Sequence, residues 1–470
     1  MTLLNQIRRL WCLTLVLFFL TFGAVFFFID FRSNYAFPVS SRDAGTVPFR
    51  DRLSENVIDT DSSTQQMAYF LNTREFGGLR HRPILPETRG KANRKPGGVF
   101  KDELFEPLMA LYRRKAKGKL APQITSFRSG NMPWVLIWAK PLSRAFWRGQ
   151  LAHIREDRCP LPCRVTFNTE KIHLVDAVVI YLQRAPNAKE ITKSLGRRNA
   201  HQPWIMLSFE APPLANDYYK IAFENFDGLF NRTMTYRRDS DIRVPHGFVV
   251  RKGFDAKAVP QKWIAPPVMR VPVRRQKLAA AFISNCRPTS DRLPYLRELK
   301  RYAPIDIYGK CGDLKCGGSL WIYKKYDPTK DKCLRMIGKK YLFFFAFENT
   351  FCKDYYTEKV FNILYYPVVP VVRGSGDYAT VLPPNSYIDS SLYSPKELAE
   401  KLLYLQSNPK EYRRYLDWKK RYRPSTIGGE RLLCHMCARL YDSDFYEHKV
   451  IEDFNEWFVV RSNCSDRVLV

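Results

Sequence analysis

Short apolar runs alternate with polar loops and helical stretches from about residue 130 onward. Each run has the length and composition of a buried strand. A capping box, Ser394-Pro395-Lys396-Glu397, has proline at the first helical position and predicts a helix through about Gln406. Strands that alternate with helices are typical of parallel sheets covered on both faces, so the pattern predicts an α/β fold. The predicted strands are Val135–Trp138, Ala177–Leu182, Trp204–Phe209, Leu278–Ile283, Ile305–Tyr308, Tyr341–Phe347 and Val368–Val372.

A proline-rich and basic segment, residues 258–277, divides these runs into two clusters at about 130–250 and 275–425. The division predicts two α/β domains that face one another across a cleft, where such folds bind ligands. We place the domain boundaries at 101–260 and 261–440. Residues 441–470 then form a C-terminal extension.

The N-terminal part has a different pattern. Leu10–Ile29 contains no charged residue, and its twenty residues match the roughly 30 Å hydrocarbon thickness of a bilayer. Arg8 and Arg9 precede the run, which predicts a cytosolic tail over 1–9 and a signal-anchor helix over 10–29. A cleaved signal peptide is the alternative, but Phe26-Phe27-Phe28 stands where small residues would mark a cleavage site. Residues 30–100 are polar and are interpreted as a lumenal stem.

Composition adds a strong basic excess. The 470 residues include 76 Lys and Arg against 46 Asp and Glu, a formal charge of +30. Such an excess attracts nucleic acid, an anionic membrane or a phosphate-bearing substrate, although a basic surface without a charged partner is equally compatible with it. The predicted lumenal location argues against nucleic acid as a partner. The charge alone does not choose between these interpretations; the N-terminal segment does, because it predicts a single-span membrane anchor and a lumenal catalytic part.

Ten cysteines follow the predicted membrane span, which contains Cys12. An even number in an oxidising compartment predicts disulfides, with their connectivity open. Cys434-His435-Met436-Cys437 raises zinc as an alternative, but no second pair with suitable spacing accompanies it. Two sequons, at Asn231 and Asn463, are candidate glycan acceptors.

Residues 341–370 contain the most informative motif. An aromatic strand ends in Glu348-Asn349, a short loop follows, and a helix is expected from Asp354 or Thr357 to Tyr366. The amino end of such a helix favours an anion, Lys359 adds a positive charge, and Glu358 is placed to bond a ribose diol. An ordinary buried crossover with a Glu–Lys surface pair is the alternative interpretation.

The same residues carry a family resemblance. The segment FENTFCKDYYTEKVFN, residues 347–362, resembles the donor motif of the α1,3-fucosyltransferases of glycosyltransferase family 10. Residues 225–247, NFDGLFNRTMTYRRDSDIRVPHG, are similar to a second block of that family, with His246 in place of the usual tyrosine. GKCGDLKCG at 309–317 and the later Cys333 are closer to invertebrate members. Further matching pieces, in the family's order, are Trp204–Pro212, Ser284–Cys286, Ile307–Gly309 and Pro383–Asp389.

The resemblance implies a GT-B-type fold, with two Rossmann-like domains, and an inverting transfer of fucose from GDP-fucose to a GlcNAc of glycoprotein N-glycans or related glycans. It assigns the acceptor to residues 101–260 and GDP-fucose to residues 261–440. The implied cofactor requirement is none, with a divalent metal at most stimulatory. By position, Glu210 is the base that deprotonates the acceptor hydroxyl, a role that a raised pKa would assist.

On the donor side the resemblance implies a set of contacts at neighbouring strand ends. Arg292 is expected at the diphosphate, to which its bidentate guanidinium is suited, and Glu348 either contacts fucose or orients the loop. At the D-x-D triplet Asp239–Asp241, Arg237 and Arg238 are expected to pair with acidic residues and structure a loop, and the triplet is not expected to hold a metal. The implied donor-binding residues are Ser284, Asn285, Arg292, Tyr308, Glu348, Asn349, Tyr355, Glu358 and Lys359.

The predicted anchor and the implied chemistry together indicate a type II protein of the Golgi membrane with a lumenal catalytic part. Two alternatives stay open at this point. One is a catalytically inactive relative of these enzymes, and the other is a lectin-like type II Golgi protein. Nothing in the sequence specifies the acceptor sugar, because its recognition lies in variable loops.

Overall fold

The computed structural model describes residues 130–138, 159–252, 277–317, 327–426 and 429–466, without 186, 197 and 200, together with the isolated positions 117 and 127. The expected cytosolic tail, signal anchor and stem lie outside these ranges, as does most of the linker at 258–277. Within them, no helix combines the length and the apolar content that crossing a bilayer requires. All described residues belong to one compact unit, residues 92–470.

The first sheet is entirely parallel, with the strand order β2-β1-β3-β4-β5-β6. It confirms the three strands predicted before residue 250. Helices α4 (Ala188–Leu195) and α5 (Pro212–Tyr219) follow β3 and β4. The strands are β1 (Trp134–Trp138), β2 (Arg164–Thr166), β3 (Ala177–Tyr181), β4 (Trp204–Ser208), β5 (Arg232–Thr235) and β6 (Ile242–Arg243).

The second sheet is also parallel, in the order β12-β11-β10-β8-β9, and it confirms the four later predicted strands. The chain leaves β8 to one side for β9 and returns on the other side for β10, so a topological switch point lies between β8 and β10. Ligands of open α/β sheets bind beyond the carboxyl ends of the strands at such a point. The strands are β8 (Lys277–Phe282), β9 (Ile305–Tyr308), β10 (Tyr341–Phe347), β11 (Val369–Arg373) and β12 (Ile388–Asp389).

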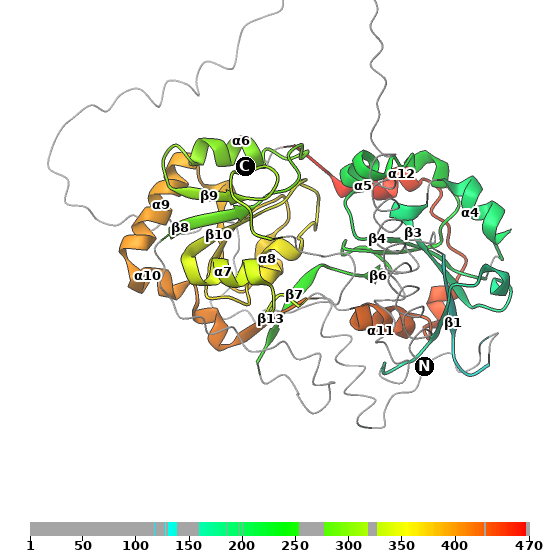
Figure 1. Ribbon diagram of the computed structural model, residues 1–470. Helices are drawn as coiled ribbons and strands as arrows, with labels where there is room; N and C mark the ends of the chain where they lie inside the picture. Colours follow the sequence, from blue (N-terminus) through cyan, green and yellow to red (C-terminus); the bar gives the residue numbers. More distant parts are fainter. Residues whose placement is uncertain are drawn as a thin grey trace, which may run out of the picture. The chain divides into compact units, whose positions relative to one another are not determined.

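Helices cover both faces of the second sheet, as the alternation of strands and helices predicts (Figure 1). Ile337 and Val360 pack from α7 and α8 on one face, whereas Leu296 and Leu402 pack from α6 and α9 on the other. The predicted capping box opens α9, where Ser394 and Glu397 bond reciprocally. The helices are α6 (Arg292–Leu299), α7 (Lys332–Lys340), α8 (Glu358–Ile363), α9 (Pro395–Ser407) and α10 (Pro409–Arg414).

The C-terminal part of the chain returns to the first sheet. Strand β13 (Tyr422–Thr426) pairs antiparallel with β7 (Gly247–Arg251). Beyond it, α11 (Gly429–Arg439) packs Leu433 and Met436 on one face of the first sheet, and α12 (Phe454–Phe458) packs its phenylalanines on the other. The boundary expected at residue 440 therefore differs from the structure, because the apolar side of α11 is buried against the first sheet.

All ten cysteines after the predicted membrane span form disulfides, which confirms that prediction. Cys434 and Cys437 of α11 bond to Cys159 and Cys163 in the segment before β2, so they are not zinc ligands. The intervening His435 directs Nδ1 at the carbonyl oxygen of Arg243, 3.1 Å away, and burial lowers its pKa to about 4. The pairs are Cys159–Cys434, Cys163–Cys437, Cys286–Cys311, Cys316–Cys333 and Cys352–Cys464.

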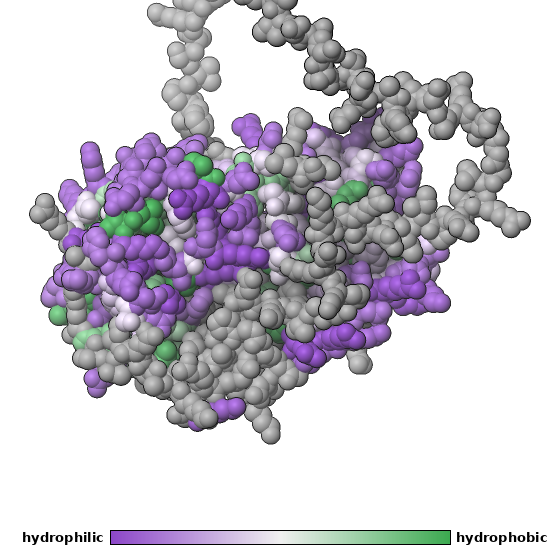
Figure 2. Space-filling view, turned by 180° about the vertical axis from the view of Figure 1, so that it is seen from behind, coloured by the Kyte–Doolittle hydropathy of each residue, from purple (hydrophilic) through white to green (hydrophobic). Residues whose placement is uncertain are grey.

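The molecular surface is mainly hydrophilic where the described residues are visible in Figure 2. Hydrophobic side chains occur there as small separate areas. The large exposed apolar residues of the described ranges, such as Leu174, Leu392 and Val460, come from different elements. Scattered exposure of this kind is normal and does not define a binding surface.

Candidate active site

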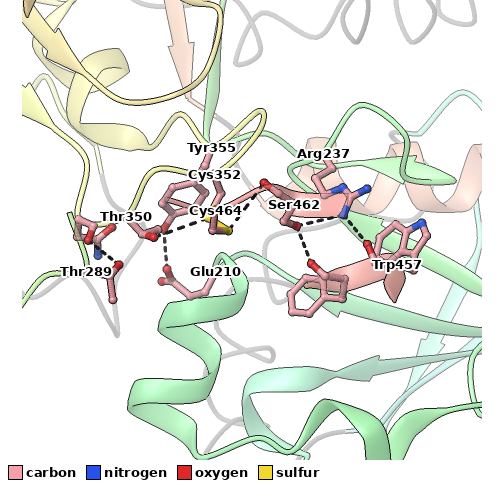
Figure 3. Close-up of a disulfide and its surroundings, with 11 residues drawn as sticks. Glu210, Arg237, Thr289, Thr350, Cys352, Tyr355, Trp457, Ser462 and Cys464 are labelled. Atoms are coloured by element: carbon pink, nitrogen blue, oxygen red, sulfur yellow. Dashed lines mark hydrogen bonds between the residues drawn. A yellow bond between two sulfur atoms is a disulfide. The ribbon is translucent and has the colours of Figure 1, made fainter. Parts of the chain in front are cut away.

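A hydrogen bond between Glu210 and Tyr355 links the two sheets. Glu210 lies two residues beyond β4, and its backbone carbonyl accepts a 2.8 Å hydrogen bond from Ser208 Oγ. Tyr355 lies in the loop between β10 and α8, and its hydroxyl donates to Glu210 Oε2 at 2.8 Å (Figure 3). The candidate base of the first sheet is thus held by a residue of the predicted donor motif.

The local chain geometry explains why Tyr355 reaches Glu210. Asp354 has a positive φ of 60°, and the amide of Tyr355 donates to the carbonyl oxygen of Cys352 at 3.1 Å. The Tyr355 ring then stands edge-on to Tyr236, with 4.9 Å between the ring centroids. Burial, followed by the charge of Glu210, raises the pKa of Tyr355 well above its ordinary value. The phenol therefore stays protonated and donates to the carboxylate.

Glu348 orients the loop, which is the second of its two expected roles. Its carboxylate is fully buried and accepts hydrogen bonds from the amide of Thr357 at 2.8 Å and from Thr357 Oγ1 at 2.9 Å. Helix α8 contains six residues and ends at Ile363, short of the expected Tyr366. The N–H at its amino end is already bonded to a protein carboxylate. One amide of the expected anion site, that of the N-cap Thr357, is therefore occupied, and the site itself stays a prediction.

Two cations lie close to one another near the switch point. Lys359 Nζ is 3.1 Å from Glu348 Oε2, and its side chain is 22% exposed. Burial and the charge of Arg292 lower the pKa of Lys359, but Glu348 and Glu358 raise it by more, so the amine stays charged. Arg292, the first residue of α6, is buried and donates to the carbonyl oxygens of Phe347 at 3.1 Å and Asn285 at 3.0 Å. Two cations thus lie beyond the carboxyl end of β10, with the carboxylates of Glu348 and Glu358 beside Lys359.

Glu358 faces His246 of the first part of the chain. His246 Nδ1 is 3.7 Å from Glu358 Oε2, and Nε2 lies 2.9 Å from the carbonyl oxygen of Phe209, next to Glu210. Burial raises the pKa of Glu358, but the charges of Lys359 and His246 lower it by more, so this half-exposed carboxylate is ionised. Sequence reasoning assigned no role to His246, although its departure from the usual tyrosine was a signal.

The remaining predicted donor residues divide into two groups. Ser284 is exposed and Asn285 is half-buried just beyond β8, where the Cys286–Cys311 disulfide joins the ends of β8 and β9. Asn349 Oδ1 is buried and has no hydrogen-bond partner among the described residues. By contrast, the hydroxyl of Tyr308 bonds to that of Tyr341, the first residue of β10, at 2.8 Å. The Tyr308 hydroxyl therefore lies away from Glu348 and Asn349, which follow the last residue of β10.

The D-x-D triplet in the first sheet structures a loop, as expected. Arg237 forms an ion pair with Asp239, and Arg238 lies 3.5 Å from Asp354. Asp241 accepts hydrogen bonds from the amide and hydroxyl of Thr233 at 2.9 and 2.8 Å. No group of three or more His, Cys, Asp or Glu residues placed to hold a metal ion occurs in the described ranges.

The two sequons differ in exposure. Asn231 is buried, accepts a hydrogen bond from the amide of Trp204 at 2.9 Å and donates to the carbonyl oxygen of Lys449 at 2.7 Å. A glycan on its Nδ2 would break the second bond, so the folded chain does not present Asn231 as an acceptor, contrary to expectation. Asn463 is exposed.

The C-terminal segment contributes to the site in a way that sequence reasoning missed. Cys464 is bonded to Cys352 of the donor motif, beside Tyr355 (Figure 3). Arg237, which is buried, donates to the carbonyl oxygen of Trp457 at 2.6 Å and to Ser462 Oγ at 3.1 Å. The even cysteine count signalled a disulfide, but not this pairing.

Comparisons with known proteins show which family this chain resembles. The model of "Fucosyltransferase, N-terminal" matches residues 130–247, and that of "Glycosyltransferase family 10 (fucosyltransferase) C-term" matches residues 272–457. Alpha-(1,3)-fucosyltransferase C of Drosophila melanogaster is 30% identical over 72% of this chain and 77% of its own length. Glycoprotein 3-alpha-L-fucosyltransferase A of the same organism is 31% identical over 66% of this chain and 57% of its own length. A crystal structure of an α1,3-fucosyltransferase with GDP-fucose aligns with 72% of this chain and 98% of that one, at 14% identity and a TM-score of 0.41.

The chain has two parallel α/β sheets, with Glu210 of the first bonded to Tyr355 of the second, and both matched models describe fucosyltransferases, a class of sugar-transferring enzymes. The matched family models span both sheets, and a relative at 30% identity covers most of the chain. The chain belongs to glycosyltransferase family 10, the fucosyltransferases.

Proposed function

We propose that this fucosyltransferase transfers L-fucose from GDP-β-L-fucose, in α1,3 linkage and with inversion, to a GlcNAc of glycoprotein N-glycans or related glycans. The observation that carries the proposal is the 2.8 Å hydrogen bond from the Tyr355 hydroxyl to Glu210 Oε2. It holds the candidate base against the loop that carries the donor motif. The names of the two Drosophila relatives both give a fucosyl linkage to position 3.

Glu210 is the general base in this proposal. Tyr355 occupies Oε2 as a donor, which fixes the carboxylate and leaves Oε1 to accept the proton of the acceptor hydroxyl. The deprotonated oxygen attacks the anomeric carbon of fucose as the bond to the GDP phosphate oxygen breaks. One displacement of this kind converts the β-linked donor into an α-linked product, and the proton ends on Glu210.

The leaving GDP diphosphate is assigned to Lys359 and Arg292. Their positive charges lie close enough that Arg292 lowers the pKa of Lys359, and they stabilise the negative charge that develops on the leaving group. The ionised Glu358 is assigned to the ribose diol. The unpaired Asn349 Oδ1 supplies a further acceptor for the donor sugar or nucleotide. Ser284 and Asn285, beyond β8, flank the same switch point.

No resident metal is assigned to this reaction. The cations of Lys359 and Arg292 supply the charge that a metal ion gives to other glycosyltransferases, so a divalent metal is at most stimulatory. We also propose a type II Golgi membrane protein with a lumenal catalytic part. The five disulfides support an oxidising compartment, and the uncharged Leu10–Ile29 supports a single-span anchor.

The test is GDP release from GDP-fucose by the full chain in detergent, with acceptors that expose a core GlcNAc, a LacNAc or a LacdiNAc unit. Product linkage is read by NMR, and the matched control is Glu210→Gln. Turnover with an α1,3 product supports the proposal and identifies the acceptor. GDP binding without turnover on any acceptor overturns it in favour of an inactive relative, and a product linked at another hydroxyl overturns the linkage.

A further inference from the structure

The C-terminal segment Val459–Asp466, here called the C-terminal strap, is anchored to the first sheet's side of the molecule. Arg237 donates to Ser462 Oγ at 3.1 Å and to the carbonyl oxygen of Trp457, just before the strap. The guanidinium carbon also lies 4.6 Å from the Trp457 ring centroid. A buried arginine with several partners resists displacement, because breaking one contact would leave buried donors unpaired.

The strap also binds the loop that carries the donor motif. The amide of Lys353 donates to the carbonyl oxygen of Ser462 at 2.8 Å. The amide of Ser465 donates to the carbonyl oxygen of Phe351, also at 2.8 Å. Between these bonds, Cys464 is joined to Cys352 by a disulfide (Figure 3). Three consecutive loop residues, 351–353, are therefore held by the strap.

A further strap contact reaches the second candidate cation. The amide of Asp291 donates to the carbonyl oxygen of Asp466 at 2.8 Å. Asp291 is also paired with Arg373, at 2.6 Å between Oδ2 and Nη2, and it directly precedes Arg292. The strap thus contacts both the donor loop and the start of α6.

The disulfide is buried against residues that surround the candidate base. Cys352 is 1% exposed and belongs to one apolar cluster with Ala211, Leu214, Tyr236 and Tyr355, against which Cys464 packs. Ala211 directly follows Glu210. The carbonyl oxygen of Cys352 also accepts the amide of Tyr355 at 3.1 Å. Moving Cys352 would therefore move the tyrosine that holds Glu210.

We propose that Cys352 and Cys464 are positioning residues whose disulfide holds the donor loop so that Tyr355 orients the Glu210 carboxylate for proton transfer. The inference rests on the proposed function. The strap and the loop are otherwise joined by backbone hydrogen bonds, whose net contribution to stability is small, so without the covalent link the loop can separate from the strap at modest cost. A misplacement of about 1 Å at a catalytic group can lower a rate about 100-fold.

The test compares Cys352→Ala/Cys464→Ala with Cys316→Ala/Cys333→Ala, whose disulfide joins the segment after β9 to α7 and includes no residue of the strap or of the loop 351–357. Both are made in the full chain, with and without Tyr355→Phe, and kcat and both KM values are measured while circular dichroism monitors folding. We expect the first pair to lower kcat about 10- to 100-fold with little change in acceptor KM. In the Tyr355→Phe background the same pair should lower kcat by less than about twofold, because both changes act on one contact.

Wild-type kcat in a folded Cys352→Ala/Cys464→Ala variant overturns the proposal, as does an equal loss of kcat in the control pair. It is also overturned if the cysteine pair lowers kcat as much in the Tyr355→Phe background as in the wild type. If the variant does not fold, limited reduction of the wild-type chain replaces it, with each disulfide quantified by mass spectrometry. Activity must then fall with reduction of Cys352–Cys464 and not with that of Cys316–Cys333. Amide exchange of residues 351–357 is a readout without turnover. If the wild type transfers no fucose, the proposed function fails. Faster amide exchange in the cysteine variant would still support the proposal that the disulfide holds the loop. Unchanged exchange would refute that proposal.

Discussion

The buried carboxylate of Glu348 lies 3.1 Å from Nζ of Lys359, and this ion pair joins the end of β10 to the first turn of α8. Lys359→Met removes the cation and leaves the Glu348 charge buried, where Thr357 still donates to it through its amide and its hydroxyl. Breaking such a pair is expected to lower the free energy of unfolding by about 3–5 kcal/mol. It should also weaken GDP binding, because the assigned diphosphate loses a charge. Denaturant unfolding and calorimetric titration with GDP measure the two effects.

The double variant Glu348→Gln/Lys359→Met separates these effects. A neutral glutamine still accepts from the amide of Thr357, so most of the lost stability should return. GDP affinity should stay low, because the cation is still missing. Recovery of GDP affinity in the double variant would contradict the assignment of Lys359 to the diphosphate.

Glu210→Gln tests the base directly. Glutamine keeps an oxygen that accepts from Tyr355 but cannot take a proton from the acceptor hydroxyl. We expect kcat to fall about 10²- to 10⁴-fold with the KM for GDP-fucose little changed. Tyr355→Phe is the matched variant that leaves the carboxylate and removes only its orienting hydrogen bond. Its loss in kcat should be smaller than that of Glu210→Gln, and retention of full activity by the glutamine variant would exclude Glu210 as the base.

The two sequons give a prediction about modification. Asn463 is exposed and should carry a glycan when the chain passes through the secretory pathway. Asn231 should be unmodified in the active chain, because its side-chain oxygen and its side-chain nitrogen both form hydrogen bonds inside the fold. Asn231→Ala would leave the buried amide of Trp204 without that acceptor and should cost about 1–3 kcal/mol of stability. Glycopeptide mass spectrometry of active enzyme checks occupancy, and a glycan on Asn231 would refute the buried placement. Asn463→Gln is the control, with little expected effect on unfolding.

The strands were predictable because each is a compact apolar run, and the capping box marked α9 by chemistry local to four residues. The donor motif was locatable because it follows a strand directly, whereas Glu210 was assigned by the resemblance to the family. The pairing of Tyr355 with Glu210 was not predictable, since it joins residues 145 positions apart. The return of α11 to the first sheet and the Cys352–Cys464 link are likewise long-range. The direction of the Tyr308 side chain was also not predictable. Its position at a strand end suggested a donor contact, but its hydroxyl points toward Tyr341.

His435 should make the fold sensitive to acid. Burial lowers its pKa to about 4, below the ordinary value of about 6.5, so the unfolded chain binds a proton between these values while the folded chain does not. Stability from this group is therefore fully present above about pH 6.5 and falls as the pH drops toward 4, by up to about 3 kcal/mol. His435→Asn keeps an N–H near the carbonyl oxygen of Arg243 and removes the titration. The slope of unfolding free energy against pH from 6.5 to 4 should become shallower in that variant, and an unchanged slope would assign the acid sensitivity to other groups.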